Sequence, residues 1–156
     1  MKAVIGDFIK DKYVALVGAS KSSHKFGNAL LRMLTKKGYI VYPVNPKEQE
    51  IEGLTCYASV KDLPPDVKGV IYCVPSTVTD SVIGELSDTG IRRVWMHQGE
   101  GGKGAYSAAA HEFCKQNGIS VVYGFCPMMF FPPVGIHKLH FLFKKWGKKL
   151  PAEYTA

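Results

Sequence analysis

A chain of 156 residues is long enough to bury a full hydrophobic core, and its length favours a single domain. The composition is 46% hydrophobic and 21% charged, as in ordinary globular proteins, and no apolar stretch is long enough to cross a bilayer. The formal net charge of +7 favours an anionic partner, which leaves phosphorylated cofactors, nucleic acid and membrane surfaces open.

The predicted elements alternate strand and helix from residue 13 onwards. Residues 13–17 and 40–44 form short apolar runs that predict strands, and residues 27–37 between them have the apolar spacing of a helix. The segment after the second strand predicts a loop with at most one irregular turn. Further elements follow in the same alternation: strands at 67–74, 93–96 and 120–123, and helices at 77–87 and 105–117.

Repeated strand–helix units with short connections predict an α/β fold: a Rossmann-like, doubly wound parallel sheet of about five strands in three layers, α/β/α. We assign residues 1–130 to this domain and residues 131–156 to a basic amphipathic C-terminal helical extension. Acidic residues near the start argue against a signal peptide, and the cysteines lie far apart with no C-x-x-C pair. Both observations predict a cytoplasmic protein without a disulfide framework.

The C-terminal extension has an apolar stripe among lysines. Helical spacing places Ile136, Leu139, Leu142 or Phe143, and Trp146 on one face. Such a stripe is expected to dock on its own domain or on a second copy of the chain, which would make a homo-oligomer. Binding of the basic helix to anionic lipid or to nucleic acid is the alternative, although no nucleic-acid partner is expected.

The segment "VALVGASKSSHKFGNALL" joins the first strand to the first helix. Gly18 permits a tight turn, Ala19 and Ser20 leave room for a phosphate, and Lys25 adds a positive charge. Gly27 opens the helix, whose N-terminal amides favour an anion. The loop is neither G-x-G-x-x-G nor the G-x-x-x-x-G-K-[ST] of a P-loop, so hydrolysis of a nucleoside triphosphate is not expected.

The end of the second strand reads "YPVNPKEQE". An NAD site needs an acidic residue there to accept the ribose hydroxyls, but the chain has Asn45, Pro46 and Lys47. A cation suits a phosphorylated ribose, as in coenzyme A or NADP. Glu48 and Glu50 follow the proline and are expected to face solvent.

Two later strand ends complete the predicted site. Val74 and Pro75 end the third strand and offer an apolar wall for an adenine ring. The glycine loop from Gly99 exposes backbone amides that could bind an amide-containing arm. His97 and Glu100 flank this loop and are candidates for acid–base chemistry on position alone.

The segments "VALVGASKSSHKFGNALL", "PVNPK", "YCVPSTV", "VWMHQG" and "CPMM" together resemble the single-domain CoA-binding proteins, a Rossmann-fold family related to the CoA-binding domain of the succinyl-CoA synthetase alpha subunit. The resemblance implies that the diphosphate lies against Gly18, Ala19, Ser20, Lys25, Phe26 and Gly27. By the same resemblance, Asn45, Pro46 and Lys47 contact the phosphorylated ribose. Val74 and Pro75 then lie on the adenine side, and Gly99 on the pantetheine side.

The sequence offers no arranged catalytic pair, so we expect a protein that carries, senses or protects CoA or acyl-CoA without its own catalytic centre. An NADP-dependent oxidoreductase is the alternative. No metal site is expected, because the H-x-x-H at 137–140 lacks a third ligand. Cys126 follows the fifth strand and could form a mixed disulfide with CoA, although an inert buried thiol is the commoner outcome.

Overall fold

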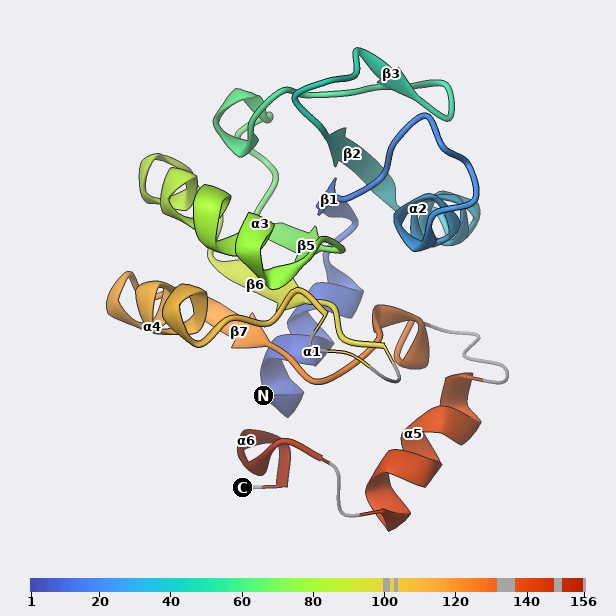
Figure 1. Cartoon of the computed structure of the whole chain (residues 1–156), viewed down its shortest axis with the longest axis vertical. Helices are drawn as coiled ribbons and strands as arrows, with labels where there is room; N and C mark the ends of the chain where they lie inside the picture. Colours follow the sequence, from blue (N-terminus) through green and yellow to red (C-terminus); the bar gives the residue numbers. More distant parts are fainter. Residues whose placement is uncertain (100–101, 103, 132–136, 148–149, 156) are drawn as a thin grey trace.

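The computed structural model describes residues 1–99, 102, 104–131, 137–147 and 150–155. Five parallel strands form its central sheet, in the order β2-β1-β5-β6-β7 (Figure 1). The strands are β1 (Tyr13–Val17), β2 (Ile40–Val44), β5 (Gly69–Tyr72), β6 (Arg93–Met96) and β7 (Ser120–Val122). Because the strand order reverses between β1 and β5, a crevice opens at their carboxyl ends, where ligands bind in sheets of this kind.

Helices cover both faces of the sheet (Figure 1). One face carries α1 (Lys2–Lys10) and α2 (Phe26–Lys36), and the other carries α3 (Ser76–Val82), η2 (Ile83–Asp88) and α4 (Ala108–Gln116). Alternate strand residues enter the two cores: Leu16 packs with α1 and α2, whereas Ala15 packs with α3 and α4. The predicted three-layer α/β/α sheet is confirmed.

Shorter elements complete the chain. They are β3 (Glu50–Ile51), β4 (Leu54–Thr55), η1 (Val60–Asp62), η3 (Pro127–Met129), α5 (His137–Trp146) and α6 (Ala152–Thr155). β3 and β4 pair as an antiparallel hairpin, whose turn places both Glu52 and Gly53 at positive φ. Sequence patterning predicted only a loop here, because two-residue strands are too short to show alternation. Among the described residues, no helix is long and apolar enough to span a lipid bilayer.

The N-terminal helix α1 was not predicted. Its side chains Ile5 and Phe8 are 4% and 2% exposed, and the ring of Phe8 meets Trp95 edge-on at 5.6 Å. Two further predicted boundaries also differ. The segment 77–87 divides into α3 and η2, and α4 begins at Ala108 because the Ser107 hydroxyl accepts the amide of Ala110 as an N-cap.

The C-terminal segment packs against the α1–α2 side of the domain. Phe141, Leu150 and Tyr154 are partly buried against that core, and the Tyr154 ring lies 5.0 Å from Phe125. Trp146, which was predicted to lie on the docking face, is 74% exposed. The contact with the domain is made instead by Phe141, five residues earlier, and docking of the predicted stripe on a second copy of the chain stays a prediction. Ile136 lies outside the described residues.

Candidate functional site

A cleft of about 660 Å³ lies at the carboxyl ends of β1, β2 and β5, where the strand order reverses. We call it the switch-point cleft. The residues predicted from the sequence that line it are Gly18, Ser20, Lys25, Asn45, Pro46, Lys47 and Val74. They come from three loops that are far apart in the chain, and the parallel sheet brings them together.

The other predicted residues lie around this cleft. Ala19 is fully buried in the core, and Gly27 is buried against the backbone of Gly18, where a Cβ would lie 2.4 Å from the carbonyl oxygen. Pro75 is exposed and precedes α3, whose first turn bonds to its carbonyl. Phe26 begins α2 and stacks on His97, outside the cleft lining.

Gly18 is required by the fold itself. It has φ +119°, and a Cβ there would lie 2.4 Å from the carbonyl oxygen of Cys73 on the neighbouring chain segment. Gly18 and Gly27 therefore let the first loop, the start of α2 and the end of β5 approach closely. This places the loop backbone, rather than bulky side chains, at the mouth of the crevice.

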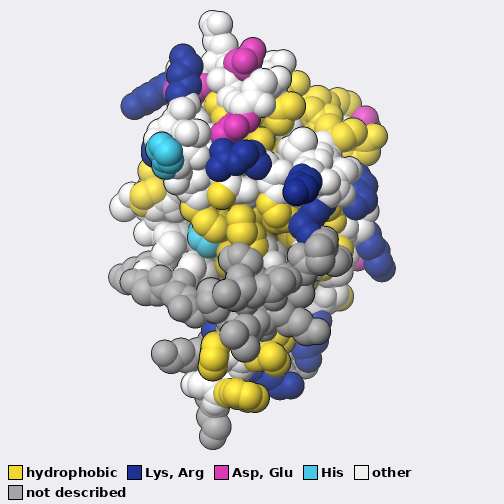
Figure 2. All heavy atoms as spheres, turned by 90° about the vertical axis from the view of Figure 1, so that its right-hand side faces the viewer, with side chains coloured by type: hydrophobic (Ala, Val, Ile, Leu, Met, Phe, Trp, Pro, Cys, Tyr) yellow, Lys and Arg dark blue, Asp and Glu magenta, His cyan; other side chains and the backbone are white. Residues whose placement is uncertain are grey.

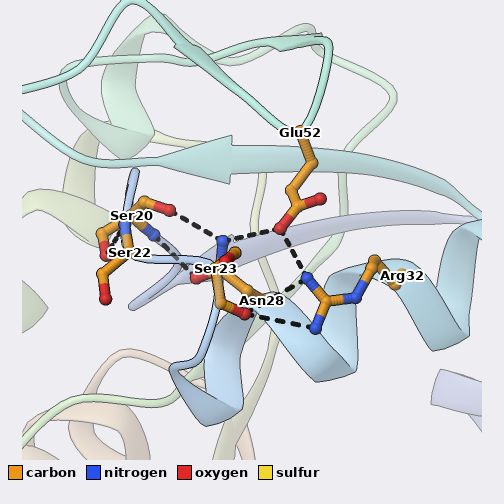
Figure 3. A network of polar contacts seen from close by, with 6 residues as sticks. All are labelled: Ser20, Ser22, Ser23, Asn28, Arg32 and Glu52. Carbon is orange, nitrogen blue, oxygen red and sulfur yellow. Dashed lines mark hydrogen bonds and ion pairs between the residues drawn. The ribbon is translucent and has the colours of Figure 1, made fainter.

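A buried amide holds the first loop in shape (Figure 3). Asn28 is 1% exposed; its Oδ1 accepts the amide of Ser20 at 3.1 Å and its Nδ2 donates to the Ser20 carbonyl at 2.7 Å. The same Nδ2 donates to Glu52 at 3.0 Å, and Arg32 donates to Glu52 at 2.6 Å and to the Ser23 carbonyl at 3.2 Å. The two hydrogen bonds between the Asn28 side chain and the Ser20 backbone fix the conformation of the first loop.

This network was missed at the sequence level. The available signal was Asn28 itself, a polar residue one turn before the buried Leu31 and about two turns before the buried Leu34 of α2. A buried amide needs partners, so its position on the apolar face predicts a hydrogen-bonded role.

Asn45 connects the second strand end to the first loop. Its Nδ2 donates to the carbonyl of Ala19 at 3.0 Å, and its Oδ1 accepts the amide of Lys47 at 3.0 Å. The second bond closes a turn that directs Lys47 into the cleft. Asn45 thus positions two neighbouring parts of the site.

Positive charge surrounds the mouth of the cleft. Lys21, Lys25 and Lys47 line it from two loops, and all three are exposed. Lys21 also pairs with Glu48 at 3.2 Å. Glu48 is only 14% exposed in its side chain and lines the cleft, so the prediction that it faces solvent is wrong. The turn closed by Asn45 brings the carboxylate back towards the first loop.

The start of α2 adds donors to this positive region. Among the described residues, no side chain caps the helix, and the N-cap residue is Lys25. The leading amides of an uncapped helix, together with the helix dipole, favour an anion. Gly18, Ser20 and Lys25 all line the cleft beside this helix start.

The opposite wall of the switch-point cleft is apolar. Val60, Val74, Val78 and Val82 line it from η1, the end of β5 and α3. At its far end the Ser59 hydroxyl donates to Glu85 at 2.6 Å and accepts the amide of Lys61. The valines of η1 and α3 were not predicted, because neither segment has a binding motif. Their place beside Val74 follows only from the fold.

Gly99 lies in a second cleft, of about 750 Å³, at the carboxyl ends of β6 and β7. We call it the tail cleft, since the C-terminal segment supplies part of its wall through Phe143, Lys144 and Leu150. The predicted pantetheine-side residue is therefore separate from the lining of the switch-point cleft.

His97 lies between the two clefts. Its ring stacks on Phe26 with centroids 4.3 Å apart and planes 12° apart. Burial, with a smaller contribution from the charge of Lys144, lowers the pKa of His97 to about 4. The imidazole is therefore neutral near pH 7. Its suggested partner Glu100 and the side chains of His137 and His140 lie outside the described residues.

The thiols are buried or partly buried. Cys126 is 5% exposed, and burial raises its pKa to about 11 in spite of opposing effects from a backbone amide and Lys144. Burial also raises the pKa of Cys73, at the end of β5. A thiol must ionise to attack a disulfide, so this arrangement disfavours the mixed disulfide suggested for Cys126.

Comparison with known proteins identifies the domain. The family model for the CoA binding domain matches residues 12–132. The chain therefore belongs to the CoA-binding domain family, as the loop motifs predicted. The match includes every strand of the central sheet and all three loops of the switch-point cleft.

Relatives and solved structures agree with this assignment. The chain is 35% identical over 122 residues to the ADP-forming acetate–CoA ligase II of Archaeoglobus fulgidus, covering 74% of this chain and 18% of the ligase. It thus spans less than a fifth of that relative's length. A conserved hypothetical protein from Pyrococcus furiosus has 40% identity and a TM-score of 0.67, covering 74% of this chain and 95% of the other. A hypothetical protein from Pyrococcus horikoshii has 27% identity and a TM-score of 0.74, covering 91% and 92%.

Proposed function

We propose that the chain binds CoA or an acyl-CoA in the switch-point cleft and carries, senses or protects it without a catalytic centre of its own. The observation that carries this proposal is the convergence of Lys21, Lys25 and Lys47 around the uncapped start of α2, in a chain of the CoA-binding family. CoA carries a diphosphate and a separate ribose phosphate, and both need such donors.

The diphosphate is assigned to the first loop. The amides at the start of α2 and the Lys25 ammonium group offer charge-assisted hydrogen bonds to its oxygens. The ribose phosphate is assigned to Lys47 at the end of β2. Glu48 also lines the cleft and pairs with Lys21, which offsets part of that ammonium charge, so the phosphate assignments rest on Lys25 and Lys47.

The adenine ring is assigned to the apolar wall formed by Val60, Val74 and Val82. A flat heterocycle packed between these valines would bury its apolar faces. The hydrogen-bonded pair Ser59–Glu85 also lines the cleft and offers polar atoms to the adenine amino group. The pantetheine arm would then leave towards β6 and Gly99.

The absence of catalysis is part of the proposal. The thiols of Cys73 and Cys126 have raised pKa values, and the His97 imidazole is stacked rather than paired with a nucleophile. The acetate–CoA ligase relatives are several times longer than this chain, so their activity is not transferred to it. The four cysteines are free in the structure, which supports our placement of the protein in the reducing cytoplasm.

Self-association through the C-terminal segment also stays a proposal. Phe143 and Trp146 on α5 are 53% and 74% exposed, and apolar side chains lie beside Lys and Arg at the lower end of the face in Figure 2. Sedimentation of the wild type and of Trp146→Ala tests it. A dimer that dissociates in the variant supports self-association, and a wild-type monomer at high concentration contradicts it.

The function is tested by thermal shift with CoA, dephospho-CoA, NAD and NADP, because a ligand of the native state raises its apparent stability. We expect stabilisation by CoA and a smaller effect of dephospho-CoA. Stabilisation by NADP and not by CoA would favour the oxidoreductase instead.

A matched pair of variants locates the site. Lys47→Ala should weaken CoA binding about 5- to 10-fold and dephospho-CoA binding much less, as expected for one lost charge-assisted contact. Lys115→Ala removes the same charge from the exposed end of α4 and should change neither. Equal losses of affinity for CoA and dephospho-CoA would contradict the assigned contact between Lys47 and the ribose phosphate.

A further inference from the structure

The tail cleft has no role in the assignments above, except for Gly99. It lies at the same edge of the sheet as the switch-point cleft, but beyond β5, at the ends of β6 and β7. Its volume of about 750 Å³ is within the usual range for small-molecule sites, roughly 300–1,000 Å³. The domain and the C-terminal segment each supply part of its wall.

The C-terminal segment is held against the domain at the cleft. The Lys144 ammonium group donates to the carbonyl of Gly124 at 2.6 Å. Pro151 lies so close to Gly124 that a Cβ there would be 2.6 Å from the proline ring. Farther along, Tyr154 packs on Phe125 and on Phe141. In Figure 1, α5 and α6 both lie in the lower part of the view, below the strands.

This wall is additional to the shared domain. The family match ends at residue 132, whereas Phe143, Lys144, Leu150 and Pro151 all follow it. A ligand group in the tail cleft would thus be recognised by residues that the matched domain does not include.

Aromatic rings form part of the tail-cleft lining, beside the polar side chains of Gln98 and Lys144. The rings of Tyr106 and Tyr123 lie 4.7 Å apart at 31°, and Phe143 faces the cleft from α5. Gly99 and Gly102 present backbone without side chains to the cleft beside these rings, whereas Pro151 fills the space at Gly124. Aromatic side chains bind planar groups by stacking on them and by burying their apolar surface away from water.

The two clefts are neighbours along the chain as well as along the sheet. Lys25 lines the switch-point cleft, and the next residue, Phe26, stacks on His97. Directly after His97, Gln98 and Gly99 line the tail cleft. A ligand with its phosphates at Lys25 needs to pass only this aromatic pair to reach the second cleft.

We propose that the tail cleft holds the acyl group of an acyl-CoA thioester, with a preference for an aromatic acyl group over acetyl. The inference rests on the proposed binding of CoA in the switch-point cleft and adds the class of acyl group. Phe143, Tyr106 and Tyr123 are its specificity-determining side chains.

The test compares binding of CoA, acetyl-CoA and benzoyl-CoA to the full chain by calorimetry. For the wild type we expect benzoyl-CoA to bind about 5- to 10-fold more tightly than CoA, the effect of burying part of one ring. Phe143→Ala should remove most of this advantage and leave CoA affinity unchanged. Tyr13→Ala is the control: it removes an exposed aromatic side chain from the start of β1, outside the cleft lining, and should keep the advantage.

A second variant fills the cleft instead of widening it. Gly102 has open space around an added Cβ, apart from the Gly104 amide at 3.9 Å, so Gly102→Leu should fold and exclude the benzoyl group. If CoA does not bind the wild type, the proposed function fails. If CoA binds but benzoyl-CoA binds no more tightly, or if Phe143→Ala and Tyr13→Ala behave alike, CoA binding stands and the acyl-group inference is overturned.

Discussion

The ring of Phe26 lies nearly parallel to the imidazole of His97, with centroids 4.3 Å apart. Phe26 begins α2 directly after the first loop, and His97 follows β6. The stacked pair lies between the two clefts. Among the described residues, the buried Nδ1 atom of His97 has no hydrogen-bond partner. The pKa of His97 is accordingly low, at about 4.

This pKa predicts a pH-dependent stability. The unfolded chain binds a proton on His97 below about pH 6.5, whereas the folded protein does so only near pH 4, so unfolding takes up a proton between these values. Stability should therefore fall as the pH drops from about 6.5 to 4, by at most about 3 kcal/mol from this group. His97→Phe keeps the stack and removes the titration.

Urea unfolding of the wild type and His97→Phe at several pH values measures the effect. The difference in unfolding free energy should change between pH 6.5 and 4 and stay constant above pH 7.5. A difference that is constant over the whole range would show that His97 titrates alike in both states.

A second prediction concerns the contact between Gly27 and Gly18. A Cβ on Gly27 would lie 2.4 Å from the Gly18 carbonyl oxygen, and neither backbone can move without disturbing the loop. Gly27→Ala should thus destabilise the protein by about 1–3 kcal/mol, as overpacking does, and weaken CoA binding.

Gly6→Ala is the control for this prediction, because a Cβ there meets nothing within 4 Å in α1. It should leave stability unchanged or raise it slightly, since alanine favours helix. Denaturation midpoints of the two variants give the comparison. Equal midpoints would mean that the loop adapts to the added methyl group.

The sequence predicted the sheet well because its strands are short apolar runs separated by glycine and proline. β1, β2 and β6 occupy the predicted residues, and the loop at Gly18 follows β1 as expected. The α1 helix was missed because only Ile5 and Phe8 are buried, and two positions show no clear period in nine residues.

The site was only partly predictable for a different reason. Gly18 and Lys47 follow the ends of β1 and β2, and Lys25 directly precedes α2, where the fold class alone indicates a ligand. Val60 and Val78 come from segments with no such marker, and the register of the sheet brings them to Val74. Glu48 was misplaced because the turn that redirects it depends on a side-chain bond of Asn45.

A third prediction tests the buried amide of Asn28, which holds the first loop. Asn28→Ala leaves the Ser20 amide without its acceptor and should cost about 1–3 kcal/mol. Asn28→Asp keeps the acceptor but sets a carboxylate against Glu52, so it should be no less destabilising. Both should also weaken CoA binding, since the loop loses its support.

Asn117→Ala is the matched control, because that exposed amide donates to the Phe113 carbonyl at the end of α4. Its unfolding free energy should change by no more than about 0.5 kcal/mol, as at most surface sites. A similar loss in Asn28→Ala and Asn117→Ala would contradict a special role for the network.

The last prediction concerns the four thiols. Burial raises the pKa of Cys56, Cys73, Cys114 and Cys126, with Cys114 at about 12 and Cys126 at about 11. Since the thiolate is the reactive species, native protein at pH 7.5 should react slowly with an aromatic disulfide reagent, and unfolding in urea should release all four thiols at once.

Ser23→Cys supplies the positive control, because residue 23 is exposed on the first loop and should react within the mixing time. Incubation with CoA disulfide, followed by intact mass measurement, should give no adduct on the native wild type. Rapid modification of the wild type that disappears in Cys126→Ser would instead show that this thiol opens to solvent in the native state, and would restore Cys126 as a partner for the CoA thiol.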